Sequence, residues 1–343
     1  MIGHSQAEAW LRRVVLDARL AHAYLVTGPR GVGRHTFALD MAMAVNCLAD
    51  DIEARPDHTC QQCRLIERGV HPDVRTVRRG DRPVIRLHAA QGANQREIVD
   101  YVDWIQADAA LRPVMARKKV YLVLNAEELV QEAADRLLKT LEEPPSFVLF
   151  VLTAVDRQGV FPTIASRCLE VRLHPASRDE LSQALMQRGA DPERAVQLAA
   201  LSGGRSGWAL AALSDPRLFE QQQAYSRQLV ELVGGSRLDR LLFARWLSER
   251  WMGQPEVVRE TLRAWLGWWH DVMLVQLGLG QRVAHLEHDE RQAIESAARQ
   301  IGMTATRRAA DSLQQSLADL DANVNPRLVL DLLLLQLPRA RLA

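Results

Sequence analysis

The segment Ala23-Tyr-Leu-Val-Thr27, followed directly by Gly28-Pro-Arg-Gly-Val-Gly33, decides the fold of this chain. Ala23–Thr27 is a short apolar run typical of a buried strand, and the closely spaced glycines indicate a loop. From Thr36 to Leu48 the apolar residues recur at helical spacing. The segment therefore predicts a strand, a glycine-rich loop and a helix, which is the framework of a phosphate-binding loop.

Two further apolar runs extend this pattern into a sheet. Val120–Leu124 and Phe147–Leu152 are predicted strands, and the helix predicted between them stops at Pro144-Pro145. Apolar strands that alternate with helices predict a parallel sheet covered on both faces. From about residue 175 the strands end and helical patterns continue. We therefore expect an α/β domain over 1–175, a small helical domain over 176–216 and an all-helical domain over 217–343.

The composition excludes several classes of protein. The chain has 343 residues, with 43 basic and 42 acidic side chains and a net charge of +1. This neutral balance argues against a disordered tail and against binding of nucleic acid by bulk charge. The longest apolar stretch, Leu328–Leu337, is too short to span a bilayer, and Met1–Trp10 lacks the pattern of a signal peptide. We therefore expect a cytoplasmic, multidomain protein without a membrane partner.

The loop keeps the glycine frame of an ATPase but not its chemical groups. The frame consists of Gly28, Gly31 and Gly33. Such glycines let backbone N–H groups turn inward around phosphates at the start of a helix. Arg34, however, stands where a compact lysine should reach the phosphates, and His35 stands where a hydroxyl should bind Mg²⁺, with Thr36 one place late. The pattern predicts a loop that retains the fold without productive ATP binding, and leaves anion binding without turnover open.

The second predicted strand lacks the acidic residues that an ATPase needs at its end. A P-loop ATPase has an aspartate there for Mg²⁺ and usually a glutamate that orients the attacking water. Here the strand ends at Leu124 and Asn125, neither of which supplies a carboxylate. Glu127 and Glu128 follow, and we interpret them as a solvated first turn of the next helix. Together with the loop, this predicts that the domain hydrolyses nothing.

Four further motifs resemble those of a known family. Leu137–Pro145 (LLKTLEEPP) and Thr163–Cys168 (TIASRC), in this order and spacing, closely resemble the bacterial clamp-loader subunits of the AAA+ class. His71-Pro72-Asp73 and Asn323–Arg327 are similar to further segments of that family. The resemblance covers nearly the whole chain. It implies an AAA+ domain with a P-loop-like parallel sheet, a helical lid and a C-terminal helical collar through which the subunits of a ring associate.

Within this family, the defective loop and the missing acid resemble the delta-prime class, whereas the gamma/tau class keeps its ATPase residues. A family arginine that senses nucleotide is replaced by Gly207, although Arg205 is close by. The resemblance implies a non-hydrolysing scaffold that works with gamma/tau-type ATPase subunits and a delta subunit, and reaches the sliding clamp and primed DNA through that complex. The alternatives are an active P-loop ATPase motor subunit and a zinc-containing DNA-binding module.

Arg167 is the residue to which the resemblance assigns a catalytic role. In the family, an arginine at this place enters the site of the neighbouring gamma/tau subunit and stabilises charge that develops on the γ-phosphate. Phe161–Ala165 is a predicted helical turn that would present Ser166 and Arg167 at a domain edge. The alternative is an ion pair of Arg167 within its own domain. We expect Ser166 to cap or orient the turn, and Cys168 to be a small core residue.

Three of the four cysteines lie close together in the sequence and predict a metal site. They are Cys47, Cys60 and Cys63. The last two form a C-x2-C half-site, which is common for structural zinc. The family has a four-cysteine zinc module here, near 47–71, and Asp57 falls at the aligned place of the missing cysteine. The adjacent His58 is the better zinc ligand by chemistry, so the resemblance implies a site completed by Asp57, completed by His58, or lost.

Tryptophans concentrate in the last third of the chain. Five of the eight are Trp246, Trp251, Trp265, Trp268 and Trp269. The apolar positions of the helix predicted around the last three exceed one helical stripe, so this helix is buried on more than one side. It is either the core of a helical bundle or part of a subunit interface.

Overall fold

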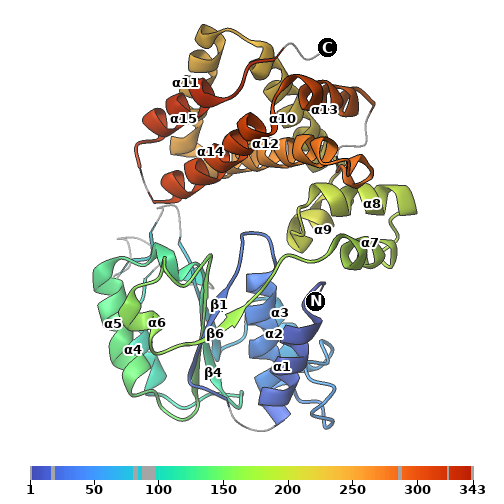
Figure 1. Ribbon diagram of the computed structural model, residues 1–343. Helices are drawn as coiled ribbons and strands as arrows, with labels where there is room; N and C mark the ends of the chain where they lie inside the picture. Colours follow the sequence, from blue (N-terminus) through green and yellow to red (C-terminus); the bar gives the residue numbers. More distant parts are fainter. Residues whose placement is uncertain are drawn as a thin grey trace. The chain divides into compact units, whose positions relative to one another are not determined.

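The computed structural model describes residues 2–16, 20–79, 84–86, 98–99, 101–284, 288–322 and 324–340. Its contacts divide the chain into two compact units, Met1–Glu180 with Arg205–Gly207, and Leu181–Gly204 with Trp208–Ala343. The first unit is α/β and the second is helical, as predicted (Figure 1). The separation of a lid over 176–216 from a collar over 217–343 stays a prediction. Of the motif Asn323–Arg327, Asn323 lies outside the described residues.

The first unit is built on six parallel strands in the order β3-β2-β4-β5-β1-β6. The strands are β1 (Ala23–Thr27), β2 (Val74–Val77), β3 (Ile98–Val99), β4 (Lys119–Val123), β5 (Val148–Ala154) and β6 (Leu169–Arg172). The three central strands β4, β5 and β1 are buried along their whole length. Because these parallel strands are neighbours, their carboxyl ends meet at one edge of the sheet, where the glycine loop begins.

Helices cover both faces of this sheet, as Figure 1 shows. One face is covered by α1 (Ser5–Leu16), α2 (Arg34–Asn46) and α3 (Gln61–Glu67), and the other by α4 (Ile105–Ala109), α5 (Gln131–Glu142) and α6 (Pro162–Ala165). A short 3₁₀ helix, η1 (Ala126–Glu128), follows β4. The apolar side chains of each helical layer form a separate buried cluster with the sheet, so burial of both faces stabilises the domain.

The second unit is a helical assembly around tryptophans. Its elements are α7 (Arg178–Met186) and α9 (Ser206–Ser214), which both begin in residues of the first unit, and α8 (Pro192–Leu201), α10 (Pro216–Gly234), α11 (Arg237–Gly253), α12 (Pro255–Gln276), η2 (Gly280–Arg282), α13 (His288–Gln300), α14 (Met303–Asp321) and α15 (Pro326–Gln336). Trp265, Trp268 and Trp269 of α12 are fully buried in one cluster, so this helix is the core of its own unit. None of the described helices has both the length and the apolar character needed to cross a bilayer.

A buried arginine ties together two helix ends in the second unit. Arg240 of α11 is only 2% exposed. It donates hydrogen bonds to the carbonyl oxygens of Leu232 (2.8 Å), Val233 (3.1 Å), Leu334 (3.2 Å), Leu337 (2.5 Å) and Pro338 (2.9 Å). These carbonyls lie at the ends of α10 and α15, where a helix leaves its last acceptors without internal partners. One planar guanidinium with five donors therefore satisfies both ends.

Candidate functional site

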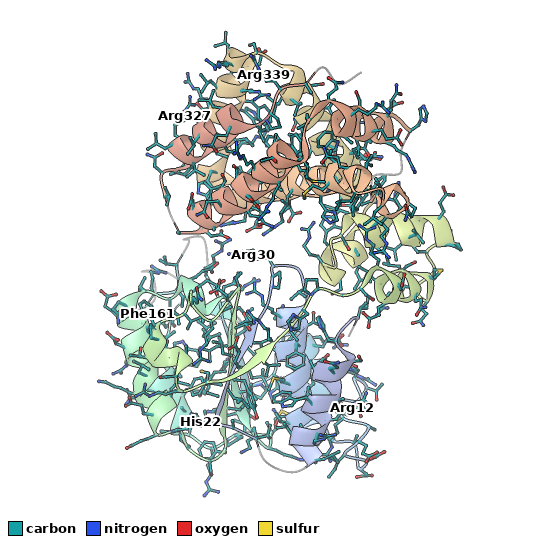
Figure 2. All side chains as sticks on the ribbon, viewed as in Figure 1. Arg12, His22, Arg30, Phe161, Arg327 and Arg339 are labelled. Carbon is teal, nitrogen blue, oxygen red and sulfur yellow. The ribbon has the colours of Figure 1, made fainter. Side chains whose placement is uncertain are left out.

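The glycine loop connects β1 to α2 at the carboxyl edge of the sheet. Gly28, Gly31 and Gly33 all adopt positive φ angles of 152°, 82° and 107°. A side chain at Gly28 would place its Cβ 2.6 Å from the carbonyl oxygen of Leu173, so only glycine fits there. Figure 2 marks Arg30 within this loop. The sequence frame of a phosphate loop is thus matched by the backbone conformation that such a loop needs.

Arg34 opens α2 and pairs with an acidic side chain. Its Nη1 lies 3.9 Å from Oε1 of Glu127, and the Arg34 side chain is 9% exposed. Burial lowers the pKa of Arg34, an effect that Glu127 opposes and Arg30 reinforces. A broad guanidinium held beside a carboxylate differs from the compact ammonium that grips terminal phosphates in an ATPase.

The structure contradicts the interpretation of Glu127 and Glu128 as a solvated first turn of the next helix. Both lie in η1, before α5 begins, and their side chains are only 18% and 9% exposed. Glu128 Oε1 lies 3.7 Å from Nη1 of Arg79, and burial raises the pKa of Glu128. Asn125, with a φ of 56°, redirects the chain directly after β4. This turn carries both carboxylates towards arginines that flank the loop, which the sequence spacing does not reveal.

At the two positions where an ATPase would bind Mg²⁺, this chain has Asn125 and His35, and neither supplies a carboxylate. The backbone N–H of Asn125 donates to Oγ1 of Thr153 at 2.9 Å, and its side-chain amide donates to Glu128 at 3.4 Å. Burial, together with nearby Arg78, lowers the pKa of His35, so its imidazole is neutral at pH 7. A neutral imidazole and a neutral amide are poor ligands for Mg²⁺.

These groups line a cavity of about 400 Å³ at the mouth of the loop. Sequence reasoning identified Gly31, Gly33, Arg34 and His35 among its lining residues. It missed Thr153 at the end of β5, and Arg78 and Arg79 after β2. The signal for these residues is topological, because they lie at or just after the carboxyl ends of strands that finish at the same edge of the sheet.

Three groups from distant segments bond to the carbonyls of the loop. His4 Nε2 lies 2.7 Å from the carbonyl oxygen of Val32, to which the Ser206 hydroxyl also donates at 3.3 Å. The N–H of Gly207 donates to the carbonyl of Gly31 at 3.1 Å. A Cβ at Gly207 would lie 3.2 Å from this oxygen. The position at which the family resemblance expects a nucleotide-sensing arginine is thus in direct backbone contact with the loop.

Arg167 follows α6, in the helical layer formed by α4, α5 and α6. Figure 2 marks Phe161, which precedes this helix, and the predicted helical turn is present as Pro162–Ala165. The Arg167 side chain is 36% exposed, and its Nη2 lies 2.6 Å from Glu142 Oε1. Ser166 donates to the carbonyl of Thr163 at 3.0 Å, inside the turn. The ion pair that we considered as an alternative role for Arg167 therefore exists, on a side chain that remains accessible.

Cys168 is buried and belongs to the cluster of the sheet and the α4–α6 layer. Burial raises the pKa of its thiol to about 12. A protonated, enclosed thiol is a packing group rather than a nucleophile.

The other three cysteines gather with Asp57 around one point. The ligand atoms of Cys47, Asp57, Cys60 and Cys63 all lie within 4.8 Å of one another, and Sγ of Cys47 lies 4.0 Å from Sγ of Cys60. Tetrahedral zinc with bonds of about 2.3 Å to sulfur separates two sulfurs by about 3.8 Å. The donor set of three sulfurs and one carboxylate oxygen therefore fits a structural zinc ion.

Backbone N–H groups lie near two of the three cysteine sulfurs in this cluster. The N–H groups of Ala49 and Asp57 both lie 3.5 Å from Cys47 Sγ, and the N–H of Cys63 lies 3.5 Å from Cys60 Sγ. Although burial opposes it, such N–H donation lowers the pKa of the Cys60 thiol. Metal-binding cysteines must be deprotonated, so this donation favours the ligand form of Cys60, whereas burial and the neighbouring cysteines raise the pKa of the Cys63 thiol.

Asp57, rather than His58, is the fourth residue of this group. Its Oδ1 accepts hydrogen bonds from the N–H groups of Cys60 and Thr59, each at 3.0 Å. The Cys60 donor makes the largest contribution to lowering the pKa of Asp57. His58 is exposed and lies outside the group. The structure therefore does not support His58 as the fourth ligand, although histidine is chemically the better zinc ligand. The local turn instead fixes Asp57 beside the cysteines.

Comparison with known proteins identifies the family. A family described as "DNA polymerase III, delta subunit" matches residues 3–177, which hold the glycine loop, the cysteine cluster and Arg167. The chain belongs to this clamp-loader family. Its relatives include the DNA polymerase III subunit delta' of Bacillus subtilis, with 26% identity over 324 residues that cover 93% of this chain and 91% of that protein.

Other clamp-loader relatives match a smaller share of the chain. The subunit tau/gamma of Haemophilus influenzae is 34% identical over 185 residues, which cover 54% of this chain and 25% of that protein. The subunit tau of Escherichia coli is 32% identical over 223 residues, or 64% and 32% of the two proteins. This chain thus spans a quarter to a third of these relatives. A gamma subunit-related protein of Thermotoga maritima, of known structure, covers 96% of this chain at 16% identity, with a TM-score of 0.46.

The cysteine cluster of this clamp-loader family member gives a direct prediction. The purified chain is expected to contain about one zinc ion, and Cys60→Ser is expected to lose it, because three ligands hold zinc more weakly than four. Metal analysis by mass spectrometry measures this loss. Cys168→Ser is the matched control and should retain the metal. Equal zinc content in both variants would contradict the assignment.

Proposed function

We propose that this chain is a delta-prime-like clamp-loader subunit that hydrolyses no ATP itself and supplies Arg167 to ATP bound by a neighbouring gamma/tau-type subunit. With that subunit and a delta subunit, it would help to load the sliding clamp on primed DNA. The observation that carries this proposal is the loop cavity. It keeps the glycine frame, but Arg34 is paired with Glu127, and the groups near the Mg²⁺ position, His35 and Asn125, are neutral.

The comparisons support the delta-prime assignment over an active ATPase motor. Similarity to the Bacillus subtilis delta' subunit runs along nearly all of both chains, whereas similarity to the tau/gamma subunits covers 54% to 64% of this chain and 25% to 32% of those proteins. The exposed position of Arg167 is also suited to a group that acts on another subunit. A structural zinc ion at Cys47, Asp57, Cys60 and Cys63, and a cytoplasmic location, are parts of the same proposal.

The test is ATPase activity with and without this chain. The isolated chain is expected to show no Mg²⁺-dependent turnover, whereas its addition to gamma/tau-type and delta subunits should raise the ATPase rate of the assembled complex. Robust hydrolysis by the isolated chain would instead identify a motor subunit. Tight, salt-sensitive DNA binding by the isolated chain would favour an independent DNA-binding module.

An exposed apolar face on the second unit supports the proposed collar. α11 and α15 pack against each other. Their outward positions carry Leu238, Leu242, Trp246, Leu328, Leu332 and Leu335, each between 36% and 66% exposed. Exposed apolar side chains of this number on two packed helices are unusual for a free surface and typical of a subunit contact. We infer that this face packs on helices of neighbouring clamp-loader subunits.

Leu332→Asp is expected to weaken assembly with the gamma/tau-type subunit at least tenfold, because it places a charge in the centre of an apolar contact. Size-exclusion chromatography or interferometry measures the change. The matched control is Gln314→Asp, at an exposed polar position on α14, outside the two helices that carry the face. If both variants assemble like the unmodified chain, this face is not the collar contact.

A further inference from the structure

Three groups of its own chain hold Arg167 at the surface of the first unit, the weakest contact being from Nη1 to the Ser166 hydroxyl oxygen at 3.4 Å. Its Nη2 lies 2.6 Å from Glu142 Oε1, and its Nη1 donates to the carbonyl of Thr163 at 2.9 Å. The side chains of Arg167 and Glu142 are 36% and 49% exposed. Because the five donors of a guanidinium lie in one plane, contacts on both terminal nitrogens fix its orientation while a partner can still reach it.

The position of Glu142 in its own helix does not explain the choice of a carboxylate. Glu142 is the last residue of α5. The negative end of a helix dipole disfavours an acidic side chain and favours a basic one, such as Lys139 in the same turn. A neutral residue would serve the helix equally well or better. The carboxylate is therefore best explained by its contact with Arg167.

The two helices that carry these residues are packed against each other. Leu137 and Leu141 of α5 lie in one buried cluster with Ile164 and Ala165 of α6. This packing fixes the backbone positions from which Glu142 and Arg167 project. A functional side chain supported in this way by packed elements is pre-organised.

We propose that Glu142 is a positioning residue that orients the Arg167 guanidinium towards the γ-phosphate of ATP in the neighbouring subunit. This inference rests on the proposed function. Without Glu142, Arg167 keeps only the contacts of Nη1 with Thr163 and Ser166 and samples more rotamers. Fewer complexes then have the arginine aligned when hydrolysis begins. The neighbour's own residues still bind the nucleotide, so the loss falls on the chemical step.

The experiment uses the reconstituted complex and single-turnover ATP hydrolysis. Glu142→Ala is expected to slow the single-turnover rate at the one site that this chain completes about three- to tenfold, while ATP binding at that site stays unchanged. Glu142→Gln, which keeps an acceptor oxygen, should recover part of the rate. Glu143→Ala is the matched control, because it removes the same charge one residue later from another exposed position. It should behave like the unmodified complex.

A double-mutant cycle with Arg167→Ala separates this inference from the proposed function. If Glu142 acts through Arg167, Glu142→Ala causes no further loss once Arg167 is replaced. Losses that multiply, or an unchanged or increased rate with Glu142→Ala alone, would overturn the positioning role while the loss with Arg167→Ala upholds the arginine finger. An unchanged rate with Arg167→Ala in an intact complex would overturn the proposed function and this inference with it.

Discussion

Replacement of Arg167 by alanine is expected to silence the one ATP site that this chain completes in a reconstituted clamp loader. An arginine supplied from a neighbour stabilises negative charge on the transferring phosphoryl group, and its removal typically lowers the rate at such a site by about 10³-fold or more. Sites completed by other subunits remain active. The measurement is therefore the amount of ATP hydrolysed in a single turnover, which should fall by the share of one site.

Assembly should be unaffected by this change, because Arg167 is an exposed side chain whose contacts are made within its own chain. The matched control is Arg157→Ala, which removes another half-exposed arginine of the same unit, paired at 3.9 Å with Glu170. It should leave the hydrolysis burst intact. A full burst with Arg167→Ala in a complete complex would reduce the role of Arg167 to its ion pair with Glu142.

The largest expected effect on stability comes from Arg240. Arg240→Met is expected to lower the free energy of unfolding of the second unit by about 3–5 kcal/mol, since it removes the buried guanidinium that donates to carbonyls at the ends of α10 and α15. Burial, followed by the nearby charge of Arg339, lowers the pKa of Arg240. Its five carbonyl contacts offset this unfavourable environment. Denaturant-induced unfolding of the full chain measures the change.

Two further variants make the role of Arg240 specific. Arg240→Lys should recover only part of the loss, because a compact ammonium cannot reach two helix ends at once. Arg245→Met, on the same helix, removes an exposed arginine that pairs with Glu249 at 2.9 Å. It should change stability by no more than about 0.5 kcal/mol. Equal effects of Arg240→Met and Arg245→Met would show that the buried contacts contribute little.

The sequence was most informative where local pattern determines structure. Apolar runs gave β1, β4 and β5, because a strand buried on both faces must be apolar throughout. The glycine spacing gave the loop, since positive φ angles there need glycine. Phe161–Ala165 gave the turn before Arg167, because proline at the start of a helix suits its fixed φ.

The sequence was least informative where a charged residue finds its partners far along the chain. Asp73 is fully buried and accepts hydrogen bonds from the N–H groups of Val114, Met115 and Ala116, at 2.7 to 2.9 Å. These donors outweigh burial and lower the pKa of Asp73. The His-Pro-Asp motif marked this position, but periodicity could not indicate its partners. Nothing in the sequence indicated that Arg240 is buried, because an arginine on a helix usually predicts an exposed face.

The candidate metal site shows how local geometry can override chemical preference. His58 is the better zinc ligand by residue type, yet the turn that follows Asp57 directs two backbone N–H groups onto the aspartate and holds it beside the cysteines. The acidic residues after β4 are a similar case. A single left-handed residue, Asn125, decides that Glu127 faces an arginine instead of water.

The contacts around the glycine loop also bear on what it would take to introduce ATP turnover at this loop. The carbonyls of Gly31 and Val32 are engaged by His4, Ser206 and Gly207, which come from opposite ends of the first unit's sequence. Under the proposed function, introducing ATP turnover would require changes at the start of α2, after the end of β4 and among the residues that contact the loop carbonyls, all in the same chain. A single substitution at any one of these places leaves the others unchanged, so under that function ATP turnover is not expected from any one of them alone.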